Sequence, residues 1–254
     1  WPLAYADVPS AADFATRRKT VEYREGLYIG YRYFTTAEKA VRFPFGYGMS
    51  YTTFAYSDMV ADEQGVSLTV TNTGSVAGTE IVQLYTAKKN SELFRPAKEL
   101  KGFARVTLAP GEKQRISIML DDKAFRFWNV KANRWEIEGG EYELLVGASV
   151  EDIRLCEKIS VQGTATVHPY EDVDLDCYYK GNVLHVSDAD FEKLLGHPIP
   201  NGKTKIDRNL TLGELNHARS PLGWLVWLVL TILLDVSYKR GKPDLNILFQ
   251  YNMP

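Results

Sequence analysis

The residues whose types could do chemistry gather in one stretch, RFPFGYGMSYTTF at positions 42–54. Its two glycines, Gly46 and Gly48, are typical of a phosphate-binding loop, but Tyr51 stands where the dinucleotide pattern Gly-x-Gly-x-x-Gly needs its third glycine. Ser50 fits the nucleophile position of a Gly-x-Ser-x-Gly elbow, but Thr52 replaces the closing glycine. We therefore predict neither a cofactor site nor a serine nucleophile here.

The same stretch carries five aromatic side chains, which could bind a sugar because flat rings stack on the C–H faces of pyranoses. The alternative is a structural joint whose rings are buried between two packed domains. Aromatic side chains are mostly buried for packing, so the second interpretation is favoured.

Possible metal ligands are too few and too scattered for a site. The acidic run 171–176 begins like a calcium loop, but Cys177 occupies the glycine position and Val183 the closing glutamate position. Four histidines show no paired ligand spacing: His168, His185, His197 and His217. We predict a solvated acidic linker and no metal site.

The run from Pro221 to Leu234 contains fourteen residues without a charge, whereas a membrane-spanning helix needs about twenty. Burial of a helix against another domain is the favoured interpretation. Trp224, Trp227 and the basic cluster 239–242 also fit peripheral membrane association through residues 221–242, and a truncated membrane span is the third alternative.

The bulk composition narrows the function classes. The 254 residues carry a formal net charge of −2, which gives no electrostatic footprint for nucleic acid. Two cysteines, Cys156 and Cys177, make no disulfide framework and favour a cytoplasmic location. The N-terminal residues show no signal-peptide pattern, and the first residue, Trp1 instead of Met, indicates an internal fragment.

Three regions must position these residues. Residues 1–54 are aromatic-rich, with Tyr23, Leu27 and Tyr31 on one face of a predicted helix. Residues 55–162 read as about seven short antiparallel strands, which predicts a mainly β fold, an immunoglobulin-like sandwich. The lack of a Cys…Trp…Cys pattern favours the fibronectin type III form.

The last region, residues 163–254, is predicted to be a polar linker followed by a mostly helical tail. A short helix is expected between Ser187, its N-cap, and Gly196, its C-cap. A second helix is expected to start near Thr211.

Longer motifs make the chain recognisable. They read YREGLYIGYRY at 23–33, FPFGYGMSYTTF at 43–54, RPAKELKGF at 95–103, LAPGE at 108–112, and GGEY, VGAS and DIR between 139 and 154. In this order they resemble the C-terminal part of glycoside hydrolase family three enzymes, chiefly the β-glucosidases, over about residues 1–160. Thr35 and Met49 depart from the family pattern.

The resemblance implies a fibronectin type III-like domain at 55–162, preceded by the end of an α/β-sandwich domain at 1–54. It also implies a retaining, exo-acting β-glycosidase that removes terminal β-linked sugars with two carboxyl groups. In that family both carboxyl groups lie outside the segments matched here, so we expect no catalytic residue in this chain. The expected partners are a β-glucoside or related substrate and the missing catalytic domains, which follow the tail in members with permuted domain order.

Two other functions stay open at this point. One is a free-standing fibronectin-like module that binds carbohydrate or protein, although residues 1–54 would have no purpose in it. The other is a peripheral membrane protein that acts through residues 221–242.

Overall fold

The computed structural model describes residues 1–11, 21–200 and 202–252. The chain divides into two compact units. The first contains residues 1–11 and 23–197, and the second contains residues 198–252 together with the short stretch 21–22. Each unit is described by itself.

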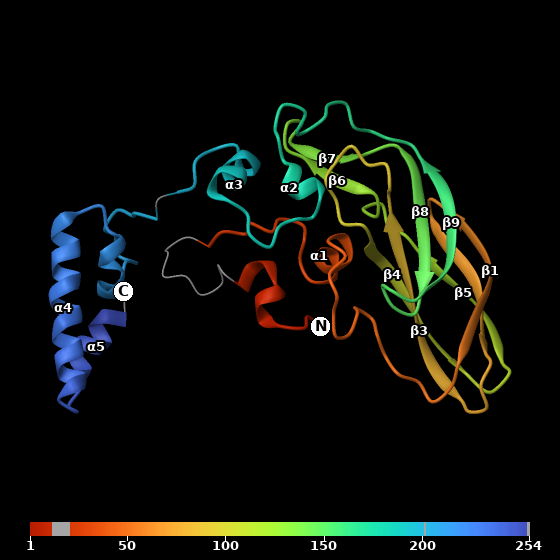
Figure 1. The fold of residues 1–254 in the computed structure, drawn as a ribbon, viewed down its shortest axis with the longest axis horizontal. Helices are drawn as coiled ribbons and strands as arrows, with labels where there is room; N and C mark the ends of the chain where they lie inside the picture. The colour runs from red at the N-terminus through yellow and green to blue at the C-terminus, as the bar shows by residue number, and fades with distance from the viewer. Residues whose placement is uncertain (12–20, 201, 253–254) are drawn as a thin grey trace. The chain divides into compact units, whose positions relative to one another are not determined.

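The first unit is built on a β-sandwich of two antiparallel sheets (Figure 1). One sheet has the strand order β1-β2-β5 and the other has the order β4-β3-β8-β9. The strands are β1 Phe54–Asp62, β2 Gly65–Asn72, β3 Gly78–Ala87, β4 Glu99–Leu108, β5 Lys113–Met119, β8 Gly140–Gly147 and β9 Ile153–Val161. These seven strands confirm the predicted mainly β sandwich.

The core of the sandwich follows from residue alternation. Every second residue of β2, namely Val66, Leu68 and Val70, is buried, because successive side chains of a strand point to opposite faces. In β3 the last six residues are all buried, as expected of a strand covered on both faces. The inward residues of both sheets form one apolar cluster.

A separate hairpin interrupts the sandwich between β5 and β8. It consists of β6 Arg126–Asn129 and β7 Arg134–Ile137, which pair only with each other. Trp128 and Trp135 are directly opposite in its register, and their rings meet edge to face at 5.4 Å. Such cross-strand aromatic pairs stabilise short hairpins.

The helix predicted around Tyr23, Leu27 and Tyr31 is wrong. The segment contains a turn, and α1 (Tyr31–Thr36) begins only at Tyr31. Gly26 and Gly30 have φ of +55° and +58°, values that favour glycine and interrupt a right-handed helix. The short 3-10 turns η1 (Tyr5–Asp7) and η2 (Pro9–Ala11) lie earlier in this region.

The predicted polar linker after residue 162 is also wrong over part of its length. Leu175 and Tyr178 are fully buried around α2 (Asp176–Tyr179), because a spacing of three places both on one side of a helical turn. They join an apolar cluster, the tyrosine cluster, with these other buried members: Tyr28, Tyr33, Phe34, Phe94 and Val183.

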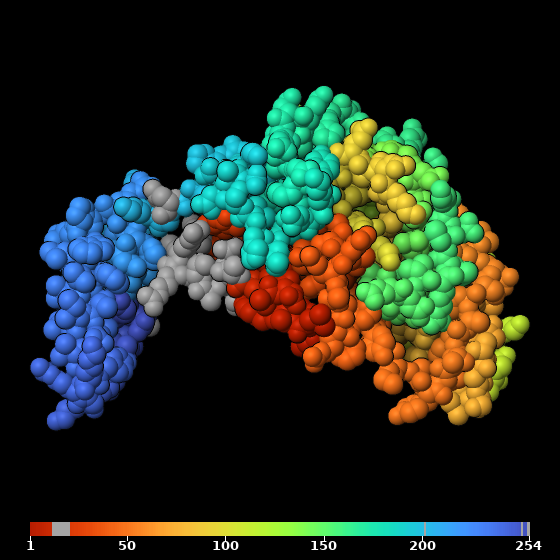
Figure 2. Space-filling model, viewed as in Figure 1, coloured from red at the N-terminus to blue at the C-terminus, as the bar shows by residue number. Residues whose placement is uncertain are grey.

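The tyrosine cluster joins segments that are far apart in sequence. Tyr28 donates a hydrogen bond to the carbonyl of Tyr178, and Tyr178 donates to the carbonyl of Arg24 at 2.9 Å. In Figure 2 the orange atoms of the first region lie against the cyan atoms of residues after 162. Residues 163–197 therefore pack with the first region, while the domain limits at 54 and 162 stay predictions.

The short helix expected before residue 196 is confirmed as α3 (Asp188–Leu195). The hydroxyl of Ser187 accepts a hydrogen bond from the Asp190 amide at 3.1 Å and caps the helix. Gly196 ends it in the left-handed conformation at φ 72°.

The second unit is helical, as predicted for the tail. Its elements are the 3-10 helix η3 (Leu212–His217) and the α-helices α4 (Pro221–Lys239) and α5 (Leu245–Asn252). Thr211 and Glu214 form a capping box at the start of η3, near the predicted helix start. Helix α5 packs on α4, where Thr231 and Tyr251 share a hydrogen bond of 3.0 Å.

Candidate functional site

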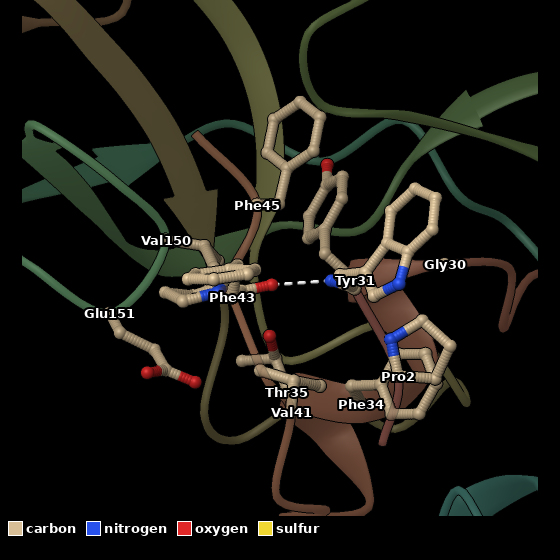
Figure 3. Close-up of a pocket in the computed structure, with 12 residues that line it drawn as sticks. Pro2, Gly30, Tyr31, Phe34, Thr35, Val41, Phe43, Phe45, Val150 and Glu151 are labelled. Carbon is tan, nitrogen blue, oxygen red and sulfur yellow. Dashed lines mark hydrogen bonds between the residues drawn. The ribbon is translucent and has the colours of Figure 1, made fainter. Parts of the chain in front are cut away.

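A pocket of about 190 Å³ lies beside the aromatic stretch 42–54 (Figure 3). Its walls come from the chain start, from α1 and the segment 41–45, and from the loop after β8. Tyr31 and Phe45 stack with ring centroids 4.6 Å apart, and Figure 3 shows Phe43 beside Val150 with Glu151 at the edge. The walls are therefore mainly aromatic and apolar.

The loop after β8 fixes the backbone of the aromatic stretch. The Val150 amide donates a hydrogen bond to the Phe45 carbonyl at 3.0 Å. The Val150 carbonyl in turn accepts one from the Lys98 ammonium at 2.8 Å. Burial lowers the pKa of Lys98. Position 45 is thus tied through two successive bonds to Lys98, the residue that precedes β4.

Gly46 turns the chain against a buried glutamine. Its φ is +82°, and a side chain there would overlap the amide group of Gln83. Gln83 donates to the Ala148 carbonyl at 2.6 Å and accepts from the hydroxyl of Tyr85, which is fully buried. Burial raises the pKa of Tyr85 well above its ordinary value. Position 46 requires glycine because its φ is positive and because the side chain of Gln83 lies too close for a Cβ atom. No phosphate-binding role is needed to explain this glycine.

The end of the stretch is anchored by a buried amide, Asn72. Asn72 accepts from the Thr52 hydroxyl at 2.6 Å and from the Gly74 amide at 3.0 Å. It donates to the carbonyls of Val76 at 2.8 Å and Leu108 at 3.0 Å. Because the buried oxygen and nitrogen of the Asn72 amide both have their hydrogen-bond partners, this side chain joins the aromatic stretch, the β2–β3 turn and β4 rigidly.

Four of the five rings of the stretch are largely exposed, which corrects the sequence interpretation, whereas Phe54 packs on the sandwich core. Met49 is 90% exposed and Tyr51 is completely exposed, and Phe43, Phe45 and Tyr47 are each about half exposed. The backbone, Thr52 and Phe54 behave as a packed joint. The other four rings form an exposed aromatic surface, in which Phe45 stacks on Tyr31.

The pocket has little capacity for bond-breaking chemistry by itself. Of the twelve residues that line it, Glu151 alone carries a carboxyl group. Retaining glycoside hydrolysis needs two carboxyl groups about 5–5.5 Å apart. The arrangement can stack on a sugar ring or on another apolar surface, and it supplies no such pair.

Glu136 in β7 is the most deeply buried carboxylate among the described residues, and no sequence motif marks it. It accepts hydrogen bonds from Arg134 at 2.6 Å and from Asn129 at 2.7 Å. Arg134 holds the pKa of this carboxyl below its usual range. Glu136 also accepts from the Thr166 hydroxyl at 3.5 Å, and its partner Asn129 donates to the Val167 carbonyl at 2.8 Å. These bonds hold the hairpin to the chain around residues 166–167, so the role of Glu136 is structural.

Among the described residues, no group of three or more His, Cys, Asp or Glu side chains could hold a metal ion. The acidic side chains of the run 171–176 are exposed, as predicted. The His168 ring contacts the Glu92 carbonyl at 2.9 Å and accepts from the Tyr170 amide at 3.1 Å.

Part of this chain is similar to a known domain family and to known glycosidases. Residues 80–150 match the fibronectin type III-like domain family. Thermostable β-glucosidase B of Acetivibrio thermocellus is 42% identical over 175 residues, which are 66% of this chain and 23% of that protein. An exo-α-(1→6)-L-arabinopyranosidase of Bifidobacterium breve is 40% identical over 173 residues, with the same shares of 66% and 23%.

Solved structures agree with these relatives. The family-three β-glucosidase of Bifidobacterium adolescentis is 32% identical with a TM-score of 0.62, over 89% of this chain and 28% of that chain. The chain spans only about a fifth to a quarter of the length of the curated relatives that it matches. The resemblance predicted from the ordered motifs is confirmed.

Proposed function

We propose that this chain is the C-terminal part of a retaining, exo-acting β-glycosidase of glycoside hydrolase family three. One observation carries the proposal: 40 to 42% identity to two glycosidases over about two thirds of the chain, with a matching fold in a family-three β-glucosidase. Identity at this level over a complete domain and its preceding segment supports common descent, which the sandwich fold alone would not.

The role of this part is structural. Its fibronectin-like sandwich holds the aromatic stretch through Asn72, Val150 and Gln83, which donates to the Gly46 carbonyl at 3.5 Å. It presents the exposed rings to the rest of the enzyme. The catalytic aspartate and glutamate then lie outside residues 1–254. The exposed rings favour this role, because a large apolar patch on a protein surface marks a contact site.

The substrate class is a terminal sugar in pyranose form. Relatives at nearly equal identity are named for β-glucosides and for α-(1→6)-linked L-arabinopyranose. We propose a β-glucoside or a related pyranoside, because the residues that would separate these sugars lie mostly with the catalytic carboxyl groups.

The test compares the complete reading frame with residues 1–254. Both are assayed with aryl β-glucoside, aryl β-xyloside and aryl α-L-arabinopyranoside. We expect the complete polypeptide to release the aryl group from at least one of them, and residues 1–254 to release none. A complete polypeptide inactive on all three, or an active 254-residue chain, would contradict the proposal.

A further inference from the structure

Helix α4 has two apolar faces, and only one is covered within its unit. The inner face packs on η3 and α5: Gly223 and Leu234 are buried, and a side chain at position 223 would lie 3.2 Å from Ala218. The other face, called the outer stripe, is exposed along the whole helix. It consists of Leu222, Leu225, Val226, Val229, Ile232, Leu233 and Val236.

The outer stripe has the spacing of a helix that packs on protein. Steps of three and four residues repeat every seven positions, from Leu222 through Val229 to Val236. This arrangement places all seven side chains within about a third of the helix circumference. Each remains 37 to 69% exposed, although all seven are Leu, Ile or Val. A solvated helix in water has no reason to carry such a stripe.

A lipid membrane explains the outer stripe less well than a protein partner does. By length and composition α4 could cross a bilayer, with nineteen residues and a mean hydropathy of 1.7. However, η3 packs on its inner face, and a crossing would carry the polar groups of η3 into hydrocarbon. A helix that lies in the interface usually presents Trp or Phe with basic residues beside them, whereas the outer stripe contains neither. Trp224 lies on the opposite side of the helix, about 160° from Leu222.

We propose that the outer stripe of α4 packs against a segment of the same enzyme polypeptide that lies outside residues 1–254. This inference rests on the proposed function. Two observations favour an intramolecular partner: the relatives are four to five times as long as their matched part, and the likeness to the family-three structure extends over 89% of this chain. A partner in the same polypeptide also avoids the entropic cost of association.

The experiment uses a matched pair of substitutions on α4. Val229→Lys places a charge at the centre of the outer stripe, and Trp224→Lys places one on the other side at nearly equal exposure, 49% against 47%. Each variant is made in residues 1–254 and in the complete polypeptide, and Tm is measured by scanning calorimetry. In residues 1–254 both should shift Tm by less than about 1 °C, because neither site is covered within the second unit.

In the complete polypeptide we expect Val229→Lys to lower Tm by at least about 2 °C and Trp224→Lys to have no comparable effect. Equal effects of the two variants would overturn the inference. So would a complete polypeptide that co-sediments with anionic vesicles, or that forms a dimer, only while the stripe is intact. The unsubstituted complete polypeptide is assayed on aryl glycosides in parallel, so failure of the stripe and failure of the proposed function give different results.

Discussion

At the level of single residues, the link between the aromatic stretch and the sandwich depends on buried hydrogen bonds. Asn72 is completely buried, and its side chain makes four hydrogen bonds. It accepts two, from a hydroxyl and a backbone amide, and donates two to backbone carbonyls. A buried polar group that loses a partner costs more than the bond contributes, because it cannot return to water. The neighbouring threonines 52 and 53 test this difference directly.

Thr52→Val should destabilise the first unit by roughly 1–2 kcal/mol, because it removes the buried donor to Asn72 and conserves side-chain shape. Thr53→Val removes an exposed bond to Thr73 of 2.8 Å and should change stability by less than about 0.5 kcal/mol. Hydrogen exchange of the β2 amides measures both. Equal losses would show that burial of Thr52 is unimportant.

The tyrosine cluster predicts a loss of stability at high pH. Burial raises the pKa of Tyr28 and of Tyr178 above the ordinary value of 10.0. Below pH 10 both states keep these protons, so the stability is fully present. Above pH 10 the unfolded chain loses them while the folded chain retains them, so stability falls as pH rises.

We expect tyrosinate absorbance of the cluster to appear together with unfolding above pH 10, and not before it. Tyr28→Phe should make the decline of stability with pH less steep, because one linked proton is removed. Denaturant titrations at a series of pH values give this slope. An unchanged slope in the variant would mean that Tyr28 ionises equally in both states.

At the level of elements, two glycines lie at helix ends but have backbone angles in different regions of φ/ψ space. Gly196 closes α3 at φ 72°, ψ 10°, which other residues can adopt at about 1 kcal/mol. Gly30 precedes α1 at φ 58°, ψ −131°, a region that is nearly restricted to glycine. An added methyl group would meet no atom within 4 Å at either site. Any difference between the two substitutions therefore reports backbone strain alone.

We predict that Gly30→Ala costs about 2–3 kcal/mol and Gly196→Ala about 1 kcal/mol. Chemical denaturation of each variant, followed by circular dichroism, gives the two values. A Gly30→Ala cost equal to or smaller than that of Gly196→Ala would contradict the conformational argument.

The same elements show what sequence patterns can and cannot predict. Alternation in β2 and the Ser187 and Gly196 caps of α3 were predicted correctly, because each is a local property of a few neighbouring residues. The helix around Tyr23 was predicted wrongly, because hydrophobic spacing does not reveal the positive φ of Gly26 and Gly30. The burial of Tyr178 was missed because its partner Tyr28 is 150 positions away.

At the level of the whole molecule, the ordered motifs predicted the similarity to family-three β-glucosidases, and the comparisons confirm that similarity. The exposure of Tyr51 and Met49 could not be predicted from residue type, since aromatic and sulfur-containing side chains are usually buried. The chain spans about a fifth to a quarter of the length of its curated relatives. Under the proposed function these exposed side chains face the rest of the enzyme, which explains why they resemble a binding site in residues 1–254.

The retaining mechanism proposed above makes a last prediction about where the nucleophile lies. A 2-deoxy-2-fluoro glycoside with a good leaving group should inactivate the complete polypeptide, because the glycosyl–enzyme ester forms faster than it is hydrolysed. Peptide mapping should then locate the sugar on an aspartate outside residues 1–254, since the pocket of this chain offers only Glu151. Glu151→Gln should leave the labelling intact. Sugar found on any residue of this chain would contradict the structural role proposed for it, and inversion at the anomeric carbon would contradict the mechanism.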